Sequence, residues 1–266
     1  MIRSHFGLET NPFDPAITPL LPHQQAVFNV LQVHARQGGL CLVMGEPGTG
    51  KSVLKHALIA HDPKKIITPS VSRTLHTYSN TLQILCEALG LDTPGRDTHR
   101  EKALIEAAWK LNHEAKLLVP ILDDAHLMDL DCLRKLRLLF EDFPKNHCLL
   151  LVAQPGLLEK LRLRVNEDLR GRITYSTLLL PLTPDDLKDF IFRELDRVRL
   201  AHNTFTDDAL ALLLRSSEGI LRRCRNLCVS SLLEAVRDRV KIIDLSQVNR
   251  VLLQPHWRAE HDLPTR

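Results

Sequence analysis

Aromatic residues are scarce in this sequence, and long apolar runs are absent. Phe, Trp and Tyr together make up 5% of the 266 residues, so the core must be mainly aliphatic. No apolar stretch has the length that a membrane-spanning helix needs. The N-terminus, MIRSHFGLETNPFDP, has no apolar segment of the kind that a secretion signal contains. We therefore expect a cytoplasmic protein without a membrane span.

Paired metal-ligand cysteines and a strong net charge are lacking as well. The six cysteines are scattered through mostly apolar stretches, which is typical of reduced core thiols in a cytosolic protein. A formal net charge of +3 neither requires nor excludes a nucleic-acid partner, because local clusters matter more than the sum. No helix-turn-helix or zinc-finger pattern is present. Function must therefore be inferred from local motifs.

Short apolar segments alternate with segments of helical periodicity over the first two thirds of the chain. The predicted strands are Leu40–Met44, Ile66–Val71, Leu117–Leu122, Leu149–Val152 and Ile173–Leu180. Strands that alternate with helices indicate an α/β fold with a mostly parallel sheet between helical layers. We therefore predict a three-layer αβα domain with a five-stranded, mostly parallel sheet.

The sequence divides into three parts. Residues 1–22 contain four prolines and are expected to form an extended N-terminal leader. Residues 23–182 are expected to form the αβα domain, and residues 183–266 a small, entirely helical domain. Thr183 and Pro184 at the start of this last part are a typical helix cap and first helical residue.

One stretch has a composition that suits neither helix nor strand. Directly after the apolar run Leu40–Met44, residues 45–52 read GEPGTGKS, which fits the P-loop pattern G-x-x-x-x-G-K-[ST]. Glycines allow successive backbone N–H groups to surround a phosphate, and the N-terminus of the following helix adds its positive end. The segment therefore predicts an ATP-binding P-loop.

The side chains around this P-loop suit binding and hydrolysis of Mg²⁺-ATP. Lys51 would contact the β- and γ-phosphates, and Ser52 would bind Mg²⁺. Asp123 and Asp124 end the strand segment Leu117–Leu122; Asp123 would hold Mg²⁺ through water, and Asp124 would polarise the attacking water. The predicted nucleotide contacts within the P-loop are Gly45, Glu46, Pro47, Gly48, Thr49, Gly50, Lys51, Ser52 and Val53. The cofactors that these residues imply are ATP and Mg²⁺.

Nearly the whole chain resembles the AAA+ ATPases. The nearest branch contains the general secretion pathway protein A ATPases and transposon helpers such as TniB and TnsC. Besides the P-loop, the resemblance is carried by Phe6-Gly7-Leu8 with Asn11-Pro12-Phe13, LLLVAQPGLL at 149–158, Leu169–Ile173 and Glu218–Arg223. It implies a P-loop domain followed by a helical lid, ATP hydrolysis, and self-assembly into a ring or filament.

The resemblance also implies roles for individual residues. Gln154 matches the first sensor, which reads the γ-phosphate. Arg172, or alternatively Arg170, matches the arginine finger that reaches the ATP of a neighbouring subunit and stabilises charge during phosphoryl transfer. Arg222 matches the lid arginine that contacts the nucleotide, and His23 is expected near the adenine.

Two residues depart from the pattern of the family. Leu221 stands where the branch often has proline, so Arg223 remains an alternative to Arg222. Asp124 stands where the family usually has glutamate, and its carboxylate is one methylene shorter. A misplacement of about 1 Å at such a position can lower the rate on the order of a hundredfold. We therefore hypothesise slow hydrolysis and a long-lived ATP-bound assembly.

Clusters of basic residues leave the partner open. They comprise Lys160, Arg162, Arg164, Arg170 and Arg172, then Arg222, Arg223 and Arg225, and finally Lys135 and Arg137. Such side chains could neutralise the phosphates of duplex DNA, or could be solvated or form intersubunit contacts. No interleaved aromatic residues suggest base stacking.

Three functions fit the sequence. The favoured one is a DNA-transposition regulator that assembles on duplex DNA with ATP and recruits or activates a transposase. A second is a secretion or pilus-assembly ATPase that acts on envelope proteins. A third is a signalling switch that binds ATP tightly with negligible turnover.

Overall fold

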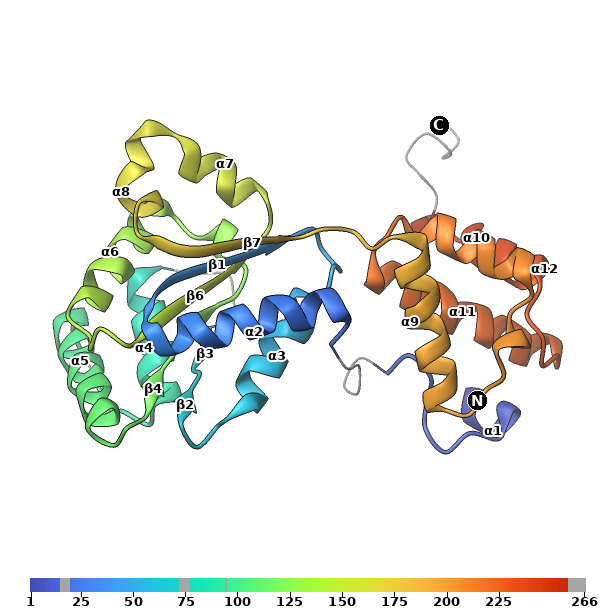
Figure 1. The fold of residues 1–266 in the computed structure, drawn as a ribbon, viewed down its shortest axis with the longest axis horizontal. Helices are drawn as coiled ribbons and strands as arrows, with labels where there is room; N and C mark the ends of the chain where they lie inside the picture. The colour runs from blue at the N-terminus through green and yellow to red at the C-terminus, as the bar shows by residue number, and fades with distance from the viewer. Residues whose placement is uncertain (15–19, 72–76, 94, 258–266) are drawn as a thin grey trace. The chain divides into compact units, whose positions relative to one another are not determined.

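The computed structural model describes residues 1–14, 20–71, 77–93 and 95–257, which form two compact units (Figure 1). The helical unit comprises Met1–Pro19, Pro47–Gly50 and Leu180–Arg266. The sheet unit comprises Leu20–Glu46 and Lys51–Leu179. Residues 15–19 of the expected leader lie outside the described residues.

The sheet unit is built on parallel strands. Its main sheet has the strand order β3–β5–β6–β1–β7, and β2 pairs with β4 beside it. The strands are β1 (Gly39–Gly45), β2 (Ile66–Ile67), β3 (Ser70–Val71), β4 (Leu117–Leu118), β5 (Ile121–Leu122), β6 (Cys148–Ala153) and β7 (Ile173–Leu179). Pro69 and Pro120 have no N–H, so they separate β2 from β3 and β4 from β5, where the sequence predicted single strands.

Helices cover both faces of this sheet (Figure 1). They are α2 (Pro22–Gln37), α3 (Lys51–His61), α4 (Tyr78–Ala88), α5 (Asp97–His113), α6 (Leu130–Glu141), α7 (Gly156–Arg162) and α8 (Glu167–Arg170). Val43 and Leu150 belong to the core cluster that includes α2 and α3, whereas Leu42 and Leu151 belong to the cluster with α4, α5 and α6. Successive strand residues thus face opposite helical layers, which gives three layers.

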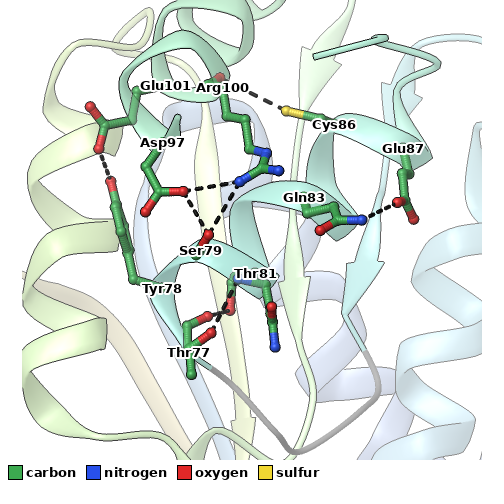
Figure 2. A network of polar contacts seen from close by, with 11 residues as sticks. Thr77, Tyr78, Ser79, Thr81, Gln83, Cys86, Glu87, Asp97, Arg100 and Glu101 are labelled. Atoms are coloured by element: carbon green, nitrogen blue, oxygen red, sulfur yellow. Dashed lines mark hydrogen bonds and ion pairs between the residues drawn. The ribbon is translucent and has the colours of Figure 1, made fainter. Parts of the chain in front are cut away.

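A polar network joins the first turns of α4 and α5 (Figure 2). The Tyr78 hydroxyl donates to Glu101 Oε1 at 2.7 Å, and Ser79 Oγ donates to Asp97 Oδ1 at 2.7 Å. Arg100 Nη1 donates to both Ser79 Oγ and Asp97 Oδ1. Burial, and then the bond to Glu101, raise the pKa of the Tyr78 hydroxyl, which therefore stays protonated. The network joins the start of α4 to the start of α5.

The helical unit packs its helices around a second core. They are α1 (Ile2–Phe6), α9 (Pro184–Arg197), α10 (Asp207–Ser217), α11 (Leu221–Asp238) and α12 (Leu245–Leu252). Threonine side chains cap α9 and α10: Thr183 accepts from the backbone N–H of Asp186, and Thr206 from that of Ala209. In the ranges that the structure describes, no helix has the length and apolarity that a membrane crossing would need.

The start of the chain differs from the extended leader that the sequence predicted. Ile2–Phe6 forms a helix, and Gly7 ends it in the left-handed conformation with φ of 73°. His5 Nε2 lies 2.8 Å from the carbonyl oxygen of Val240, just beyond α11. The high proline content of residues 1–22 begins only at Pro12, so it gave no information about this first turn.

Glu194 anchors the N-terminal segment within the helical unit. Its side chain is 3% exposed, and its Oε2 accepts from the backbone N–H of Phe13 at 2.9 Å. Arg197 Nη2 donates to the same oxygen at 2.8 Å and also to the carbonyl oxygen of Asn11. A buried carboxylate is tolerated here because its charge has both an ionic and a main-chain partner.

We therefore expect Glu194→Gln to lower the free energy of unfolding by about 1.5–3 kcal/mol, because hydrogen bonds to a buried charge are lost. Denaturant unfolding followed by circular dichroism measures this change. Asp189→Asn, an exposed change of the same kind on α9, should stay within about 0.5 kcal/mol of the native chain. Equal stability of the two variants would show that Glu194 contributes nothing to anchoring.

Candidate functional site

Three neighbouring strands place polar residues at one edge of the sheet. β6 pairs in parallel with β1 on one side and with β5 on the other. At their carboxyl ends, β1 ends with Gly45, β6 is followed by Gln154 and β5 is followed by Asp123. In open α/β sheets, ligands bind outside the carboxyl ends of the strands. The candidate site therefore lies at this edge.

The turn between β1 and α3 has a backbone that requires glycine. Gly48 has φ of 91° and Gly50 has φ of 103°, which side-chain-bearing residues rarely adopt. Lys51 is the first residue of α3, and its Nζ donates to the carbonyl oxygens of Gly45 at 2.6 Å and Glu46 at 2.9 Å. The predicted P-loop is thus a strand–turn–helix segment whose helix N-terminus begins at the lysine.

The other predicted contact residues differ in exposure. Glu46, Pro47 and Ser52 are exposed, Thr49 is buried, and Val53 is half-buried on α3. His23 lies in the first turn of α2, where it is half-buried and its Nε2 is shielded from solvent.

Gly48 packs against the start of α11 within the helical unit. The backbone N–H of Arg222 donates to the Gly48 carbonyl oxygen at 3.2 Å. A Cβ added at Gly48 would lie 2.8 Å from the Arg222 Cβ and 2.8 Å from Ile220 Cγ2. The absence of a side chain at Gly48 is therefore a condition for this contact.

Arg222 and Arg223 have different surroundings. Arg223 Nη1 lies 2.5 Å from Glu218 Oε2, and its guanidinium lies 6.0 Å from the centre of the Trp257 ring. The Arg222 side chain is exposed, and within the described ranges no acidic group pairs with it. Of the two alternatives for the lid arginine, Arg222 is the one that is not held by an acidic neighbour.

The two acids after β5 differ in their backbone environment. Asp123 is tied to the sheet, because its N–H donates to the Val71 carbonyl oxygen at 2.9 Å. Asp123 Oδ1 accepts from the N–H of Asp124 at 3.0 Å. Asp124 adopts the left-handed conformation, with φ of 52° and ψ of 34°. Aspartate and asparagine tolerate this conformation better than most residues, whereas glutamate has no such advantage.

Lys55 is a site residue that the sequence analysis missed. Its Nζ lies 2.5 Å from Asp123 Oδ2, and the two side chains are 9% and 16% exposed. Lys55 follows Lys51 by one helical turn, so both lysines lie on the same side of α3. A lysine between the buried Leu54 and Leu58 was the available sequence signal, because buried lysines need a partner.

Gln154 is linked to the acid loop through its backbone. Its N–H donates to His126 Nδ1 at 3.4 Å, and His126 lies in the short helix η1 (Ala125–Leu127) after Asp124. The His126 carbonyl oxygen in turn accepts from Lys160 Nζ at 3.1 Å. His126 therefore connects the ends of β5 and β6 through hydrogen bonds. The backbone that carries the Gln154 side chain is held by this contact.

The two candidates for the arginine finger lie away from these contacts. Arg172 is 62% exposed and pairs with Glu141 on α6 at 3.3 Å. Arg170 pairs with Glu167 within α8 at 3.8 Å. Both precede β7, and neither has a contact with Lys51, Asp123 or Asp124 in the described part of the chain.

The residues present suit a Mg²⁺-nucleotide. The turn at Gly48 and Gly50 presents backbone rather than side chains, as a phosphate cradle needs. Ser52 is exposed, and across the described residues its hydroxyl has no protein partner. A serine hydroxyl and the Asp123 carboxylate are hard oxygen ligands of the kind that Mg²⁺ prefers. The Lys55 ammonium already occupies one oxygen of that carboxylate.

Part of this chain matches a known protein family. Residues 34–161 match the AAA domain family. That range contains β1, the P-loop, both acids and β6. Over this range the chain is similar to that family.

Individual proteins are also similar to this chain. General secretion pathway protein A of Aeromonas hydrophila is 28% identical over 250 residues, which are 88% of this chain and 45% of that protein. The chain therefore spans less than half of this relative.

The solved structure of Cdc6p from Pyrobaculum aerophilum aligns with a TM-score of 0.70 at 19% identity, over 87% of this chain and 67% of that one. The ORC1 protein of Aeropyrum pernix in complex with DNA aligns with a TM-score of 0.69 at 19% identity, over 90% and 67%. These likenesses confirm the predicted fold class: an AAA+ fold with a five-stranded parallel sheet and a helical C-terminal region.

We expect Gly48→Ala to lower the free energy of unfolding by about 1–3 kcal/mol, because its Cβ would overlap the start of α11. Thermal unfolding measures the change. Gly156→Ala is the matched control: a Cβ there meets nothing within 4 Å, and the residue starts α7, so alanine should be neutral or slightly stabilising. A Gly48→Ala chain as stable as the control would show that this close approach is not required.

Proposed function

We propose that this chain is a Mg²⁺-ATP-dependent, self-assembling AAA+ ATPase that binds duplex DNA and recruits or activates a transposase. The observation that carries the ATPase part is that Lys51 begins the helix after β1, whereas Asp123 and Asp124 follow β5, and both of these strands pair in parallel with β6. We further propose a cytoplasmic location, in line with six buried free cysteines.

The chain's own residues would divide the work of hydrolysis. Lys51 would exchange the carbonyl oxygens of Gly45 and Glu46 for phosphate oxygens. Ser52 and Asp123 would hold Mg²⁺, which when bound neutralises charge on the phosphates. Asp124 would accept the proton of the attacking water, and Gln154 would orient the γ-phosphate from the end of β6.

The geometry of Asp124 supports slow turnover. The short carboxylate stands on a left-handed backbone whose N–H is already bound to Asp123. A glutamate would extend the carboxylate by one methylene, but it would be less suited to φ of 52°. Aspartate therefore fits the backbone conformation at the expense of reach toward the water.

We expect Asp124→Glu to raise the turnover number about tenfold or more, because positioning errors near 1 Å cost on the order of a hundredfold. Asp124→Asn should abolish turnover while nucleotide binding stays intact. Steady-state phosphate release, with fluorescent-nucleotide titration as the binding control, measures both. A folded, nucleotide-binding Asp124→Glu chain that is no faster than the native one would contradict the proposed role of carboxylate length.

Self-assembly is supported by the exposure of Arg172. This residue lies at a turn before β7, its side chain is 62% exposed, and its guanidinium pairs with Glu141. An exposed ion pair of this kind contributes little stability, so a phosphate of an adjoining subunit could replace it. We propose Arg172 as the arginine finger, with Arg170 as the alternative.

DNA binding is supported by a segment that we name the basic tip, comprising residues 162–165. Arg162 and Arg164 alternate there with Leu163 and Val165, and all four side chains are exposed. In the described part of the chain, neither arginine has an acidic partner. Arg134 supports the tip from α6, donating to the Val165 carbonyl oxygen at 2.8 Å. The tip thus offers two uncompensated cations on a supported loop, as contacts to backbone phosphates require.

The other basic residues are less available. Lys135, Arg137 and Arg223 form ion pairs with Asp131, Glu141 and Glu218 respectively. Lys160 binds the carbonyl oxygen of His126, and burial lowers the pKa of Arg225. These engagements leave Arg162 and Arg164 as the first candidates for phosphate contacts in the sheet unit.

We expect duplex DNA to stimulate ATP turnover, and the double change Arg162→Gln with Arg164→Gln to weaken DNA binding. Because each phosphate contact contributes about −0.9 to the slope of log affinity against log salt, the slope should become shallower by about 2. Fluorescence anisotropy over a salt series measures this. Lys64→Gln with Lys110→Gln, two exposed positions, removes the same charge and should leave the slope unchanged. Equal slopes in both double variants would exclude the basic tip.

A second candidate function is a secretion or pilus-assembly ATPase. The observation in its favour is the 28% identity with general secretion pathway protein A over 88% of this chain. Under this function, DNA would change neither turnover nor assembly at low salt, whereas membrane-assembly proteins would bind the chain.

A further inference from the structure

A single lysine neutralises the carboxylate that the proposed function assigns to magnesium. Lys55 Nζ lies 2.5 Å from Asp123 Oδ2, while Asp123 Oδ1 accepts the N–H of Asp124 at 3.0 Å. The lysine side chain is 9% exposed. Both oxygens of Asp123 therefore have partners before any ligand arrives.

The helix makes this contact a fixed feature of the site. Lys55 lies one turn after Lys51, and the neighbouring Leu54 and Leu58 are 2% exposed in the sheet core. If the buried ammonium of Lys55 turned toward water, the Asp123 carboxylate would be left without its ionic partner. Because both groups are largely shielded from solvent, separation of this ion pair is unfavourable. Asp123 is held from the other side by its N–H bond to Val71.

We propose that Lys55 is a resident cation that competes with the divalent ion for Asp123, so that nucleotide affinity depends only weakly on Mg²⁺. This inference rests on the proposed function, since it concerns the same nucleotide site. Lys55 is a positioning residue: it acts through Asp123 and has no assigned contact with substrate.

The charge of Lys55 should affect nucleotide affinity in opposite ways without and with Mg²⁺. Without Mg²⁺, the ammonium cancels the charge of Asp123, which would otherwise repel a nucleotide polyphosphate. With Mg²⁺, the ion must share Asp123 with the ammonium or displace it, so the ion gains less at this carboxylate. Removing the Lys55 charge should therefore weaken binding in chelator and strengthen it in Mg²⁺.

The test is the ratio of nucleotide affinity in Mg²⁺ to that in EDTA, measured on the full chain by titration of a fluorescent ADP analogue. The native chain should give a ratio near unity, and Lys55→Met should raise the ratio about tenfold or more. Lys55→Arg retains the charge and should keep the native ratio. Lys64→Met removes an equal charge from an exposed position beyond α3 and should also keep the native ratio.

Asp123→Asn completes the experiment and remains informative if Lys55→Met fails to fold. In the Asp123→Asn background, adding Lys55→Met should leave the ratio unchanged, because the partner of Lys55 is already gone. Thermal unfolding of every variant confirms folding.

A large ratio for the native chain, or an unchanged ratio for folded Lys55→Met, would overturn the resident-cation role while leaving nucleotide binding established. Failure of the native chain to bind nucleotide in either buffer would instead overturn the proposed function and this inference with it.

Discussion

The pairing of β1 on both sides fixes the position of the candidate site. β1 is hydrogen-bonded to β6 along one edge and to β7 along the other, and residues 41–44 are almost fully buried. A shift of one residue would place every side chain of the strand on the opposite face of the sheet. The strand must therefore end at Gly45, and this end determines where the P-loop turns and where α3 begins.

Helix α3 transmits that constraint to the acids. Because Leu54 and Leu58 are packed against the sheet, the rotation of α3 about its axis is set, and Lys51 and Lys55 share the side that faces the strand ends. Lys51 then reaches the carbonyl oxygens of its own loop, and Lys55 reaches Asp123. Core packing and site geometry are thus consequences of the same helix placement.

The sequence predicted the strands and helices well where a hydrophobic period and a cap coincided. Thr183-Pro184 indicated the start of α9, and the P-loop pattern indicated the β1–α3 junction. The misses have local causes. Residues 2–6 are too few for a periodic signal, and Pro69 and Pro120 interrupt apolar runs that read as continuous strands.

The candidate site was only partly predictable, because a sequence motif gives the residue type at each position but not the backbone conformation or the neighbouring side chains. A pattern of apolar residues followed by two aspartates identifies Asp123 and Asp124, yet the left-handed backbone of Asp124 depends on the turn into η1. Likewise, Lys55 is an ordinary helical lysine in sequence. Its role follows only from the register between α3 and β5, which is a tertiary property.

Both lysines of the candidate site have oxygen partners within the protein. Lys51 is bound to main-chain oxygens, and Lys55 is bound to Asp123. Ligand entry at such a site is an exchange of partners, and its net free energy is the difference between two sets of strong interactions. In the proposed nucleotide site, a polyanion would therefore not meet an unpaired Asp123 carboxylate. The same compensation would leave less driving force for a divalent ion, and together with the short Asp124 side chain it is the physical basis of the proposed slow turnover.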